Sequence, residues 1–591
     1  MQTIPQRLSA LRAALRERGA DACIVPTSDY HGSEYVSPHF RLREYLTGFD
    51  GSAGTLVVTQ AGAYLWTDGR YFLQAEAQLK GSGIELMRIG VRGVPTIKDF
   101  LHDTLPDAAV VALDGRTMDA AAVKELRQAF TDKDMEIRHD PTLFDGLWPD
   151  RPALPAEKAW LLDERYAGES AKDKLLWLRR EMEKHAADVW VLSGCEDIAW
   201  LLNLRGGDLP HTPVPLCFCF VEKERVCLCM DASKRDEATS AALEALGVEF
   251  RPYEGAYGFA CRYGQGVTAV LSESKVNFAL WEVLTQNALV LDVKDAIGLR
   301  KSIRNAVQIE NLHQAHVKDG AALTRFIYEV KKNGAAWREA EAADRLDALR
   351  LQTEGCLGLS FDTICGYGKN AAIVHYRAAK GADAKIENRG LLLVDSGGQY
   401  YEGTTDVTRT IVMGPLTPEE KRHYTLTLKG MLSLMTARFP AGTRGAQLDV
   451  LARAPMWREG LDYRHGTGHG VGYLLGVHED PVRIRNSSES FVFAPGMVVS
   501  DEPGVYCENS HGVRLENLLL CKADADTPYG RFLSFETLTL VPLERAAVET
   551  DMLSREEIDA LNAYHKRVYE ALSPYFEGEA LAWLQEATWP I

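Results

Sequence analysis

The stretch LLLVDSGGQYYEGTTDVTRT (391–410) decides the fold of the C-terminal half of the chain. It is typical of two strands joined through a turn, because two strand-forming runs flank glycine and polar residues. Asp395 ends the first, apolar strand and Asp406 returns on its partner, so the two carboxylates are expected to lie close enough to share a cation. Taken alone, an Asp at the end of a strand is more often a turn-forming residue.

HGTGHG (465–470) places two histidines four residues apart. On a helix this spacing is typical of a zinc pair, but the interleaved glycines argue against a helix. We therefore expect a loop or an irregular strand, in which one histidine can face a metal while the other faces a substrate.

Two glutamates follow in the next fifty residues. Glu502 comes after the apolar APGMVVS and before a Pro-Gly turn, where a simple turn carboxylate is the alternative. Glu516, in GVRLENLLL (512–520), is expected inside an apolar strand, where a carboxylate is costly unless it is paired or metal-bound. Arg514 lies two residues earlier on the same strand face and can hold a carboxylate or orient Glu516.

These stretches together define a hard, oxygen-rich set of candidate ligands. The set is too acidic for one structural zinc ion and suits two divalent cations. Such a pair makes water nucleophilic at neutral pH and stabilises both ends of a displacement, so the sequence predicts a metal-dependent hydrolase. The candidate ligands are Asp395, Asp406, His469, Glu502 and Glu516.

Composition narrows the class of protein. A chain of 591 residues suggests three or four domains. Its net charge of −17 argues against nucleic acid or an anionic membrane as a partner, because both require a basic face. The N-terminus has no apolar signal-peptide core, and no apolar run is long enough to span a membrane. Eleven cysteines, an odd number without the spacing of a secreted scaffold, indicate a cytoplasmic protein.

The N-terminal half contains an apparent duplication. Residues 20–68 and 186–231 each show a short apolar strand, an apolar segment ending in glycine and a hairpin, each preceded by a helix. Asp21 and Asp188 hold matching places in the two copies. A proline-rich stretch (139–158) is the expected linker between them.

We therefore predict an α/β (α+β) chain of three domains, with boundaries at 1–157, 158–302 and 303–591. The last domain is expected to begin with a long helix over about 307–332 and to end in helices from Ser554 onward.

Two Cys-x-Cys pairs, CFC (217–219) and CLC (227–229), leave two interpretations open. A strand places the sulfurs of each pair on one face, so two such strands can form a four-thiolate zinc cluster. The favoured alternative is a buried hairpin that uses Cys as a small apolar residue.

The chain resembles the pita-bread metallopeptidases and, within them, the cytosolic three-domain aminopeptidases P. The resemblance covers essentially the whole chain and includes GFDGSAG, WTDGRYFLQA, IAWLLNLRG, NAAIVHY, VHED, SDEPGVY and GVRLEN besides the stretches above. It implies two duplicated domains like the N-terminal domain of creatinase, followed by a pita-bread catalytic domain.

The resemblance also implies roles for individual residues. Asp395 would bind one ion, His469 and Glu502 the other, and Asp406 and Glu516 both; manganese is the expected metal, with cobalt and zinc as alternatives. A hydroxide held between the ions would attack the scissile carbonyl, with Glu502 as general base. Further catalytic or substrate-binding residues are implied at His375, His465, His478, Arg70, Tyr506 and Arg514.

The implied substrates are short peptides with proline in the second position, and the implied assembly is a homodimer. An Xaa-Pro bond lacks the N–H that general peptidases use. The alternatives are a prolidase, which usually has one N-terminal domain; a methionine aminopeptidase, which lacks the duplicated modules; and a binding protein that has lost its metals. The complete ligand set argues against the last.

Overall fold

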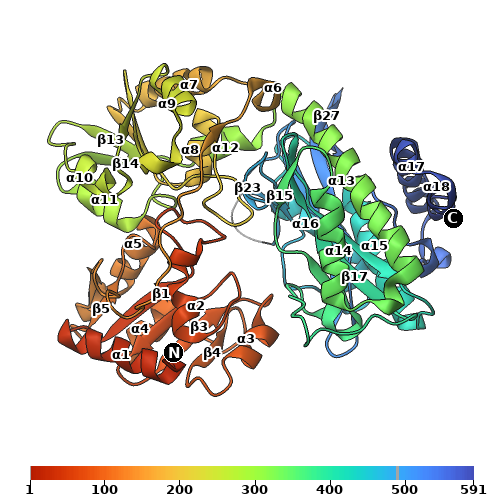
Figure 1. The fold of residues 1–591 in the computed structure, drawn as a ribbon, viewed down its shortest axis with the longest axis horizontal. Coiled ribbons are helices and arrows are strands. Elements are labelled where there is room, and N and C mark those ends of the chain that lie inside the picture. Colours follow the sequence, from red (N-terminus) through yellow and green to blue (C-terminus); the bar gives the residue numbers. More distant parts are fainter. Residues whose placement is uncertain (1, 487–490) are drawn as a thin grey trace. The chain divides into compact units, whose positions relative to one another are not determined.

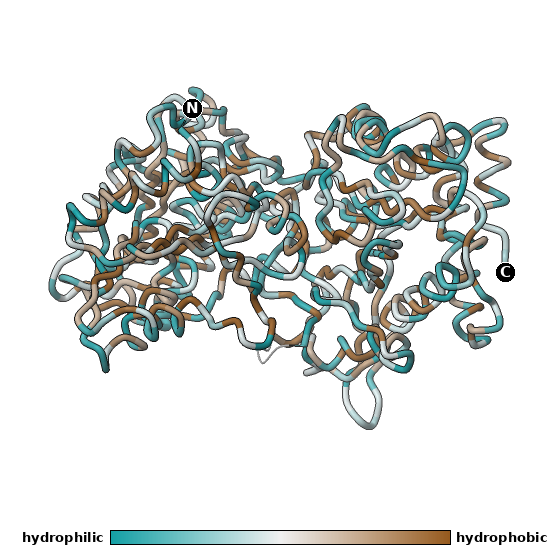
Figure 2. The backbone as a smooth tube through the Cα atoms, turned by 90° about the horizontal axis from the view of Figure 1, so that it is seen from below, coloured by the Kyte–Doolittle hydropathy of each residue, from teal (hydrophilic) through white to brown (hydrophobic). Residues whose placement is uncertain are grey.

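The computed structural model describes residues 2–486 and 491–591, and the chain forms two compact units (Figure 1). The first unit comprises Met1–Glu164 and Glu169–Ala296, and the second comprises Arg165–Gly168 and Ile297–Ile591. Short hydrophilic (teal) and apolar (brown) stretches follow one another along the backbone in both units (Figure 2). Among the described residues, every helix is too short or too polar to cross a membrane.

The first unit contains two six-stranded sheets with the same topology. Their strand orders are β4-β3-β2-β1-β5-β6 and β12-β11-β10-β8-β13-β14. In each sheet the central strand pairs antiparallel with one strand of a hairpin on one side and parallel with one strand on the other, and that strand has a further parallel neighbour. The predicted duplication is confirmed by this match.

The strands of the first sheet are β1 (Ala22–Pro26), β2 (Thr55–Thr59), β3 (Ala63–Thr67), β4 (Glu85–Arg88), β5 (Val110–Leu113) and β6 (Glu136–His139). Those of the second are β8 (Val189–Leu192), β10 (Phe218–Glu222), β11 (Val226–Cys229), β12 (Val248–Arg251), β13 (Thr268–Leu271) and β14 (Leu289–Asp292). The matching helices are α1 (Ile4–Glu17) with α7 (Ala171–Lys184), α2 (Leu42–Thr47) with α8 (Cys195–Leu202), and α5 (Ala120–Ala129) with α11 (Phe278–Thr285).

Asp21 and Asp188 perform the same structural task in the two copies. Each precedes the central strand, and its Oδ2 accepts a hydrogen bond from the backbone N–H at the start of the neighbouring parallel strand. The distance from Val110 N to Asp21 Oδ2 is 2.8 Å, and that from Thr268 N to Asp188 Oδ2 is 2.9 Å. Each aspartate thus fixes the register of a parallel pair.

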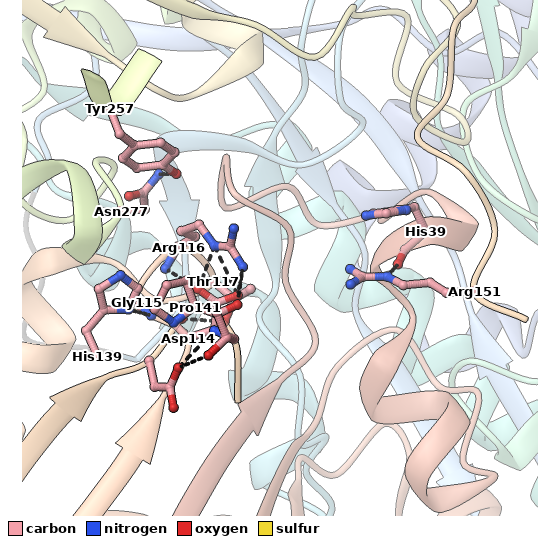
Figure 3. Close-up of polar contacts among 12 residues, drawn as sticks. His39, Asp114, Gly115, Arg116, Thr117, His139, Pro141, Arg151, Tyr257 and Asn277 are labelled. Atoms are coloured by element: carbon pink, nitrogen blue, oxygen red, sulfur yellow. Dashed lines mark hydrogen bonds and ion pairs between the residues drawn. The ribbon is translucent and has the colours of Figure 1, made fainter. Parts of the chain in front are cut away.

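Backbone hydrogen bonds join the two copies through the segment after β5. The N–H groups of Phe278 and Ala279 donate to the carbonyls of Met118 and Gly115 over 2.8 and 3.0 Å. The segment is held in place by Arg116, whose Nε and Nη2 bind the Asp114 carboxylate in the bidentate geometry of a strong ion pair (Figure 3).

The second unit contains helices on layers of mostly antiparallel sheet. The sheet orders are β15-β18-β19, β16-β17-β20, β21-β28-β27-β24-β22-β23 and β25-β26. Its strands are β15 (Cys356–Leu359), β16 (Ile364–Tyr367), β17 (Leu391–Ser396), β18 (Gly398–Tyr400), β19 (Gly403–Thr404), β20 (Val407–Val412), β21 (Arg438–Pro440), β22 (Gly468–Gly470), β23 (Glu479–Ile484), β24 (Val498–Asp501), β25 (Gly504–Cys507), β26 (His511–Arg514), β27 (Asn517–Thr527) and β28 (Gly530–Thr537). Its main helices are α13 (Ala306–Asn333), α14 (Glu339–Leu351), α15 (Pro418–Met435), α16 (Gly445–Trp457), α17 (Arg555–Leu572) and α18 (Gly578–Ala587).

The helices predicted at the N-terminus, at 307–332 and after Ser554 are all present. Leu8, Leu11 and Leu15 bury one face of α1. Ser554 caps α17, because its side chain accepts a hydrogen bond from Glu557 N.

Two expectations about local structure require correction. β17 and β20 are antiparallel partners as predicted, but β18 and β19 lie between them in the chain, so the connection is a small hairpin and not a simple turn. Glu516 lies between the end of β26 and the start of β27 and is not inside one strand. Because Glu516 lies outside both strands, its side chain does not have to follow the alternation of side chains between the two faces of a sheet.

The four-thiolate zinc cluster is excluded by the register of the β10–β11 hairpin. Phe218 and Phe220 lie opposite Cys229 and Cys227, so the CLC sulfurs share a sheet face with these phenylalanines. Cys219 is paired with Leu228 and faces the opposite side. The four cysteines are buried free thiols, which fits their use as small apolar side chains.

Candidate metal centre

Four of the five predicted ligands lie at or next to strand ends of the second unit, and the fifth, His469, lies within a short strand. Asp395 lies near the end of β17, Asp406 directly before β20, and His469 in the middle of β22. Glu502 directly follows β24, and Glu516 directly precedes β27. A strand end anchors the backbone in the sheet while leaving the side chain free to point into a shared site.

Asp406, His469 and Glu516 form the centre of the group. Each offers a ligand atom, and these atoms all lie within 4.8 Å of one another. His469 Nε2 lies 3.4 Å from Asp406 Oδ2 and 3.5 Å from Glu502 Oε1. Glu502 is thereby placed at the edge of the same cluster.

The tautomer of His469 is fixed by a backbone carbonyl. Its Nδ1 lies 2.9 Å from the Gly470 oxygen, which can only accept, so Nδ1 carries a proton. A carbonyl at one ring nitrogen is the usual partner of a metal-binding histidine, because it orients the other nitrogen as a ligand. In His469 that nitrogen is Nε2, which faces the carboxylates.

Two carboxylate oxygens of the cluster are buried without a hydrogen-bond partner. They are Asp395 Oδ1 and Glu516 Oε1. The other oxygen of each residue is satisfied: Arg514 Nη2 donates to Asp395 Oδ2 over 2.6 Å, and Thr408 Oγ1 donates to Glu516 Oε2 over 2.9 Å. A buried carboxylate oxygen without a donor is costly, and a cation removes that cost. The donor set therefore fits divalent cations.

The pKa shifts of the clustered side chains also indicate a site for cations. Burial raises the pKa of Glu502 to about 7, against the opposing effect of His469. Burial, followed by the neighbouring Asp406 and Glu502, raises the pKa of Glu516 well above its usual range. Burial lowers the pKa of His469, but Asp406 and Glu502 outweigh it and raise that pKa to about 9. The concentrated negative charge needs positive counter-charge.

Arg514 connects this cluster to two aromatic side chains. Besides Asp395 it donates from Nη1 to the Tyr506 hydroxyl over 2.9 Å, and that hydroxyl lies 2.7 Å from His465 Nε2. Arg514 is almost fully buried. The structure therefore brings together Asp395, Arg514, Tyr506 and His465 in one hydrogen-bonded chain.

Three other predicted residues occupy different positions. The His478 ring stands edge-on to His469, with ring centroids 4.2 Å apart. His375 follows a short 3-10 helix (Gly368–Ala372) and is partly buried. Arg70 belongs to the first unit, where its Nε and Nη2 bind the Asp68 carboxylate over 2.8 Å each.

Sequence reasoning missed several residues that hold this centre. Thr408 both donates to Glu516 and accepts from Arg514 Nε over 3.2 Å. Ser500 donates to Glu502 and accepts from the His469 backbone. The sequence pattern that could have indicated them is a spacing of two residues. Thr408 lies two residues after Asp406 and Ser500 two residues before Glu502, so each is expected on the same side of an extended chain as a predicted ligand. Asp501 is fully buried with both oxygens unpartnered; nothing in the structure explains it.

Comparison with known proteins identifies the class. Residues 310–523 match the model of metallopeptidase family M24, and residues 531–591 match the C-terminal region of peptidase M24. Residues 7–139 and 150–308 each match a creatinase/prolidase N-terminal domain.

Relatives that match over the whole chain identify the group within this family. A probable Xaa-Pro aminopeptidase P from Pyrenophora teres is 39% identical over 99% of this chain and 92% of its own, and aminopeptidase P2 from Arabidopsis thaliana is 38% identical over 100% and 89%. The crystal structure of X-prolyl aminopeptidase from Caenorhabditis elegans, described as a cytosolic enzyme with a di-nuclear active site, matches with a TM-score of 0.96 at 32% identity over 100% of both chains.

The chain therefore belongs to the aminopeptidase P group of metallopeptidase family M24, and its fold is two creatinase-type N-terminal domains followed by a pita-bread catalytic domain. A prolidase from Thermococcus sibiricus shares the fold at 20% identity and a TM-score of 0.52, but covers only 64% of this chain.

Proposed function

We propose that this chain is a metal-dependent aminopeptidase that releases the N-terminal residue from peptides with proline in the second position. The observation that carries the proposal is the convergence of Asp406, His469 and Glu516, with Glu502 beside them, around unpartnered carboxylate oxygens. It stands within a chain that matches aminopeptidases P over its full length.

Two divalent cations, when bound, lower the pKa of water and polarise the scissile carbonyl. We assign Asp395 to one ion, His469 and Glu502 to the other, and Asp406 and Glu516 to both. Manganese is proposed because four carboxylates and one imidazole suit a hard cation. Cobalt and zinc are the alternatives.

The side chains around the ligands supply positioning and proton transfer. A Glu502 oxygen would accept the proton of the attacking water and deliver it to the leaving proline nitrogen, because Glu502 lies beside His469 at the edge of the ligand cluster. His478, beside His469, and His375 would bind the peptide carbonyls. His465 is oriented by Tyr506 and would contact the reacting carbonyl; Arg514 fixes Asp395.

Proline at the second position follows from the same chemistry. The tertiary amide has no N–H and its ring fixes φ, so a site that holds the free amine on one side and the ring on the other needs no extended backbone. We further propose that Arg70 contacts the peptide, that the chain works as a cytoplasmic homodimer, and that its domains divide near residues 157 and 302.

The test is hydrolysis of an Xaa-Pro-Pro tripeptide by metal-stripped protein with and without added manganese. Release of the free first residue only with manganese supports the proposal. Cleavage of Xaa-Pro dipeptides without cleavage of the tripeptide would assign the chain as a prolidase. Cleavage of neither, with no change in melting temperature on adding manganese, would favour a non-catalytic binding protein.

A further inference from the structure

A second cluster of metal-binding side chains lies in the catalytic unit, apart from the five carboxylate and imidazole ligands. His423, Cys507 and His511 each offer a ligand atom, and these atoms lie within 4.8 Å of one another. His423 Nδ1 lies 2.9 Å from His511 Nε2 and 3.6 Å from Cys507 Sγ. Both histidines are buried and the cysteine is partly buried.

The spacing of these atoms is close to that of a zinc coordination shell. Zinc binds nitrogen at about 2.0–2.1 Å and sulfur at about 2.3 Å in a tetrahedron. Two such nitrogens lie roughly 3.3 Å apart, and a nitrogen and a sulfur roughly 3.6 Å apart. The observed sulfur–nitrogen distance is 3.6 Å. The two imidazole nitrogens, at 2.9 Å, would move apart by only a few tenths of an ångström.

Three secondary-structure elements hold the donors. Cys507 ends β25 and His511 begins β26, and the two residues are directly paired across the hairpin, so their side chains share a face. His423 lies on α15, which packs against this hairpin. The ligands thus come from rigid elements and not from one flexible loop.

The second nitrogen of His511 is already oriented. Its Nδ1 lies 2.8 Å from Ser510 Oγ, which leaves Nε2 directed at His423. This is the outer-shell contact that metal-binding histidines commonly make. Both rings are buried, and burial favours the neutral form of imidazole, which is the form that binds a metal.

The first turn of α15 carries two acidic residues, Glu419 and Glu420. Glu419 lies one turn before His423, and its negative charge acts on all three donors. A cation between the donors would be stabilised by that charge, and Glu419 or a water molecule would complete a four-coordinate shell. Burial and Glu419 raise the pKa of Cys507, which disfavours a free thiolate, but a bound metal favours the deprotonated form.

We propose that His423, Cys507 and His511 form a separate structural zinc site that fastens the β25–β26 hairpin to α15. Binding of Zn²⁺ replaces the thiol proton of Cys507, which passes to solvent, while the two neutral imidazoles bind through Nδ1 and Nε2. Thiolate and imidazole favour zinc, whereas carboxylates suit manganese, so the chain would hold two kinds of metal centre.

The site would act on the catalytic ligands through the hairpin. Glu502 precedes β25 and Glu516 follows β26, so both leave the open end of the hairpin whose closed end carries Cys507 and His511. Fastening the closed end limits the motion of both glutamates. The inference does not rest on the peptidase activity proposed above.

The test is titration of the full-length, reduced, metal-stripped protein with Co²⁺ while recording its absorption spectrum. A thiolate bound to Co²⁺ gives a charge-transfer band in the near ultraviolet, and the five ligands assigned to the catalytic centre include no sulfur. We expect this band in the natural protein, its loss on adding Zn²⁺, and its loss in Cys507→Ser. Cys356→Ser, which alters another partly buried thiol of the same unit, is the control and should keep the band.

Zinc content gives an independent readout. After equilibration with Zn²⁺ and Mn²⁺ together, Cys507→Ser and His511→Gln should each bind zinc at this site at least about tenfold more weakly than the Cys356→Ser control. The proposal is overturned if no charge-transfer band forms, or if the band persists in Cys507→Ser. Equal zinc affinity in all three variants would also overturn it.

Discussion

The guanidinium of Arg514 donates from Nη2 to Asp395 Oδ2 over 2.6 Å while Asp395 Oδ1 stays buried and unpartnered. One carboxylate is therefore divided between two tasks. Asp395 Oδ2 is paired with the fixed guanidinium of Arg514, and Asp395 Oδ1 remains available to a metal ion. This division orients Asp395 before any metal arrives.

Replacing Arg514 with lysine tests this orientation. Lysine keeps the charge but cannot bind Asp395, Tyr506 and Thr408 at once, because it lacks the planar fork. We expect turnover to fall about 100-fold with metal content retained. Steady-state kinetics with metal quantification on the same sample measures both. Arg531→Lys, on an exposed hairpin, is the control, and equal turnover in the two variants would contradict the assignment.

Asp406→Ala removes the residue assigned to both ions. Its Oδ2 lies 3.4 Å from His469 Nε2, and its ligand atom lies within 4.8 Å of those of both His469 and Glu516. We expect loss of turnover together with loss of bound metal, measured by elemental analysis after dialysis. Asp526→Ala, an exposed carboxylate of the same unit, should behave like the natural protein. Full metal occupancy and activity in Asp406→Ala would refute a dinuclear centre.

His478→Ala should separate turnover from metal binding. The ring stands edge-on to His469 and is assigned to the substrate and not to a metal. We expect a fall of about 100-fold in kcat with unchanged metal content. A parallel loss of metal would instead make His478 a ligand or a support of His469.

Tyr564→Phe tests how the C-terminal helix stabilises the centre. The Tyr564 hydroxyl accepts from Arg409 Nη2 over 2.7 Å and donates to the Val541 carbonyl over 2.8 Å, and Arg409 Nη1 also binds the Glu516 carbonyl. Leaving these buried groups unpaired should lower the free energy of unfolding by about 1–3 kcal/mol. Urea denaturation measures it. Tyr569→Phe, a half-buried tyrosine on the same helix, should change it little.

His565 should make stability depend on pH. It is fully buried, its Nε2 accepts from Leu543 N, and burial, followed by Arg545 and Arg409, lowers its pKa to about 3. The unfolded chain binds a proton at its ordinary pKa of about 6.5, so the folded state loses stability as pH falls below that value.

Between pH 7 and pH 5 this loss amounts to about 2 kcal/mol. His565→Gln keeps a hydrogen-bond acceptor but does not titrate, so its stability should fall by about 2 kcal/mol less than that of the natural protein over the same range. Urea denaturation at several pH values provides the comparison. Parallel pH profiles would show that His565 does not titrate as described.

The sequence predicted the ligand stretches better than their surroundings. Glycines and apolar runs around Asp395, His469 and Glu502 indicated strand ends, because hydrophobic pattern and turn chemistry are local. The partnership of Thr408 with Glu516 was not predictable, since it joins residues 108 apart in the chain. The junction position of Glu516 was missed for the same reason: one apolar run was divided between two strands by tertiary pairing.

The position of Arg409 has a consequence for the gene. Five of its acceptors lie after residue 515, and among them are the carbonyls of Val541 and Pro542 and the hydroxyl of Tyr564. A nonsense mutation between Leu543 and Tyr564 would spare every codon for a candidate metal ligand. It would still remove the Tyr564 hydroxyl, which accepts from the buried guanidinium that also holds the Glu516 carbonyl. Loss of the C-terminal segment from Tyr564 onward is therefore expected to abolish activity.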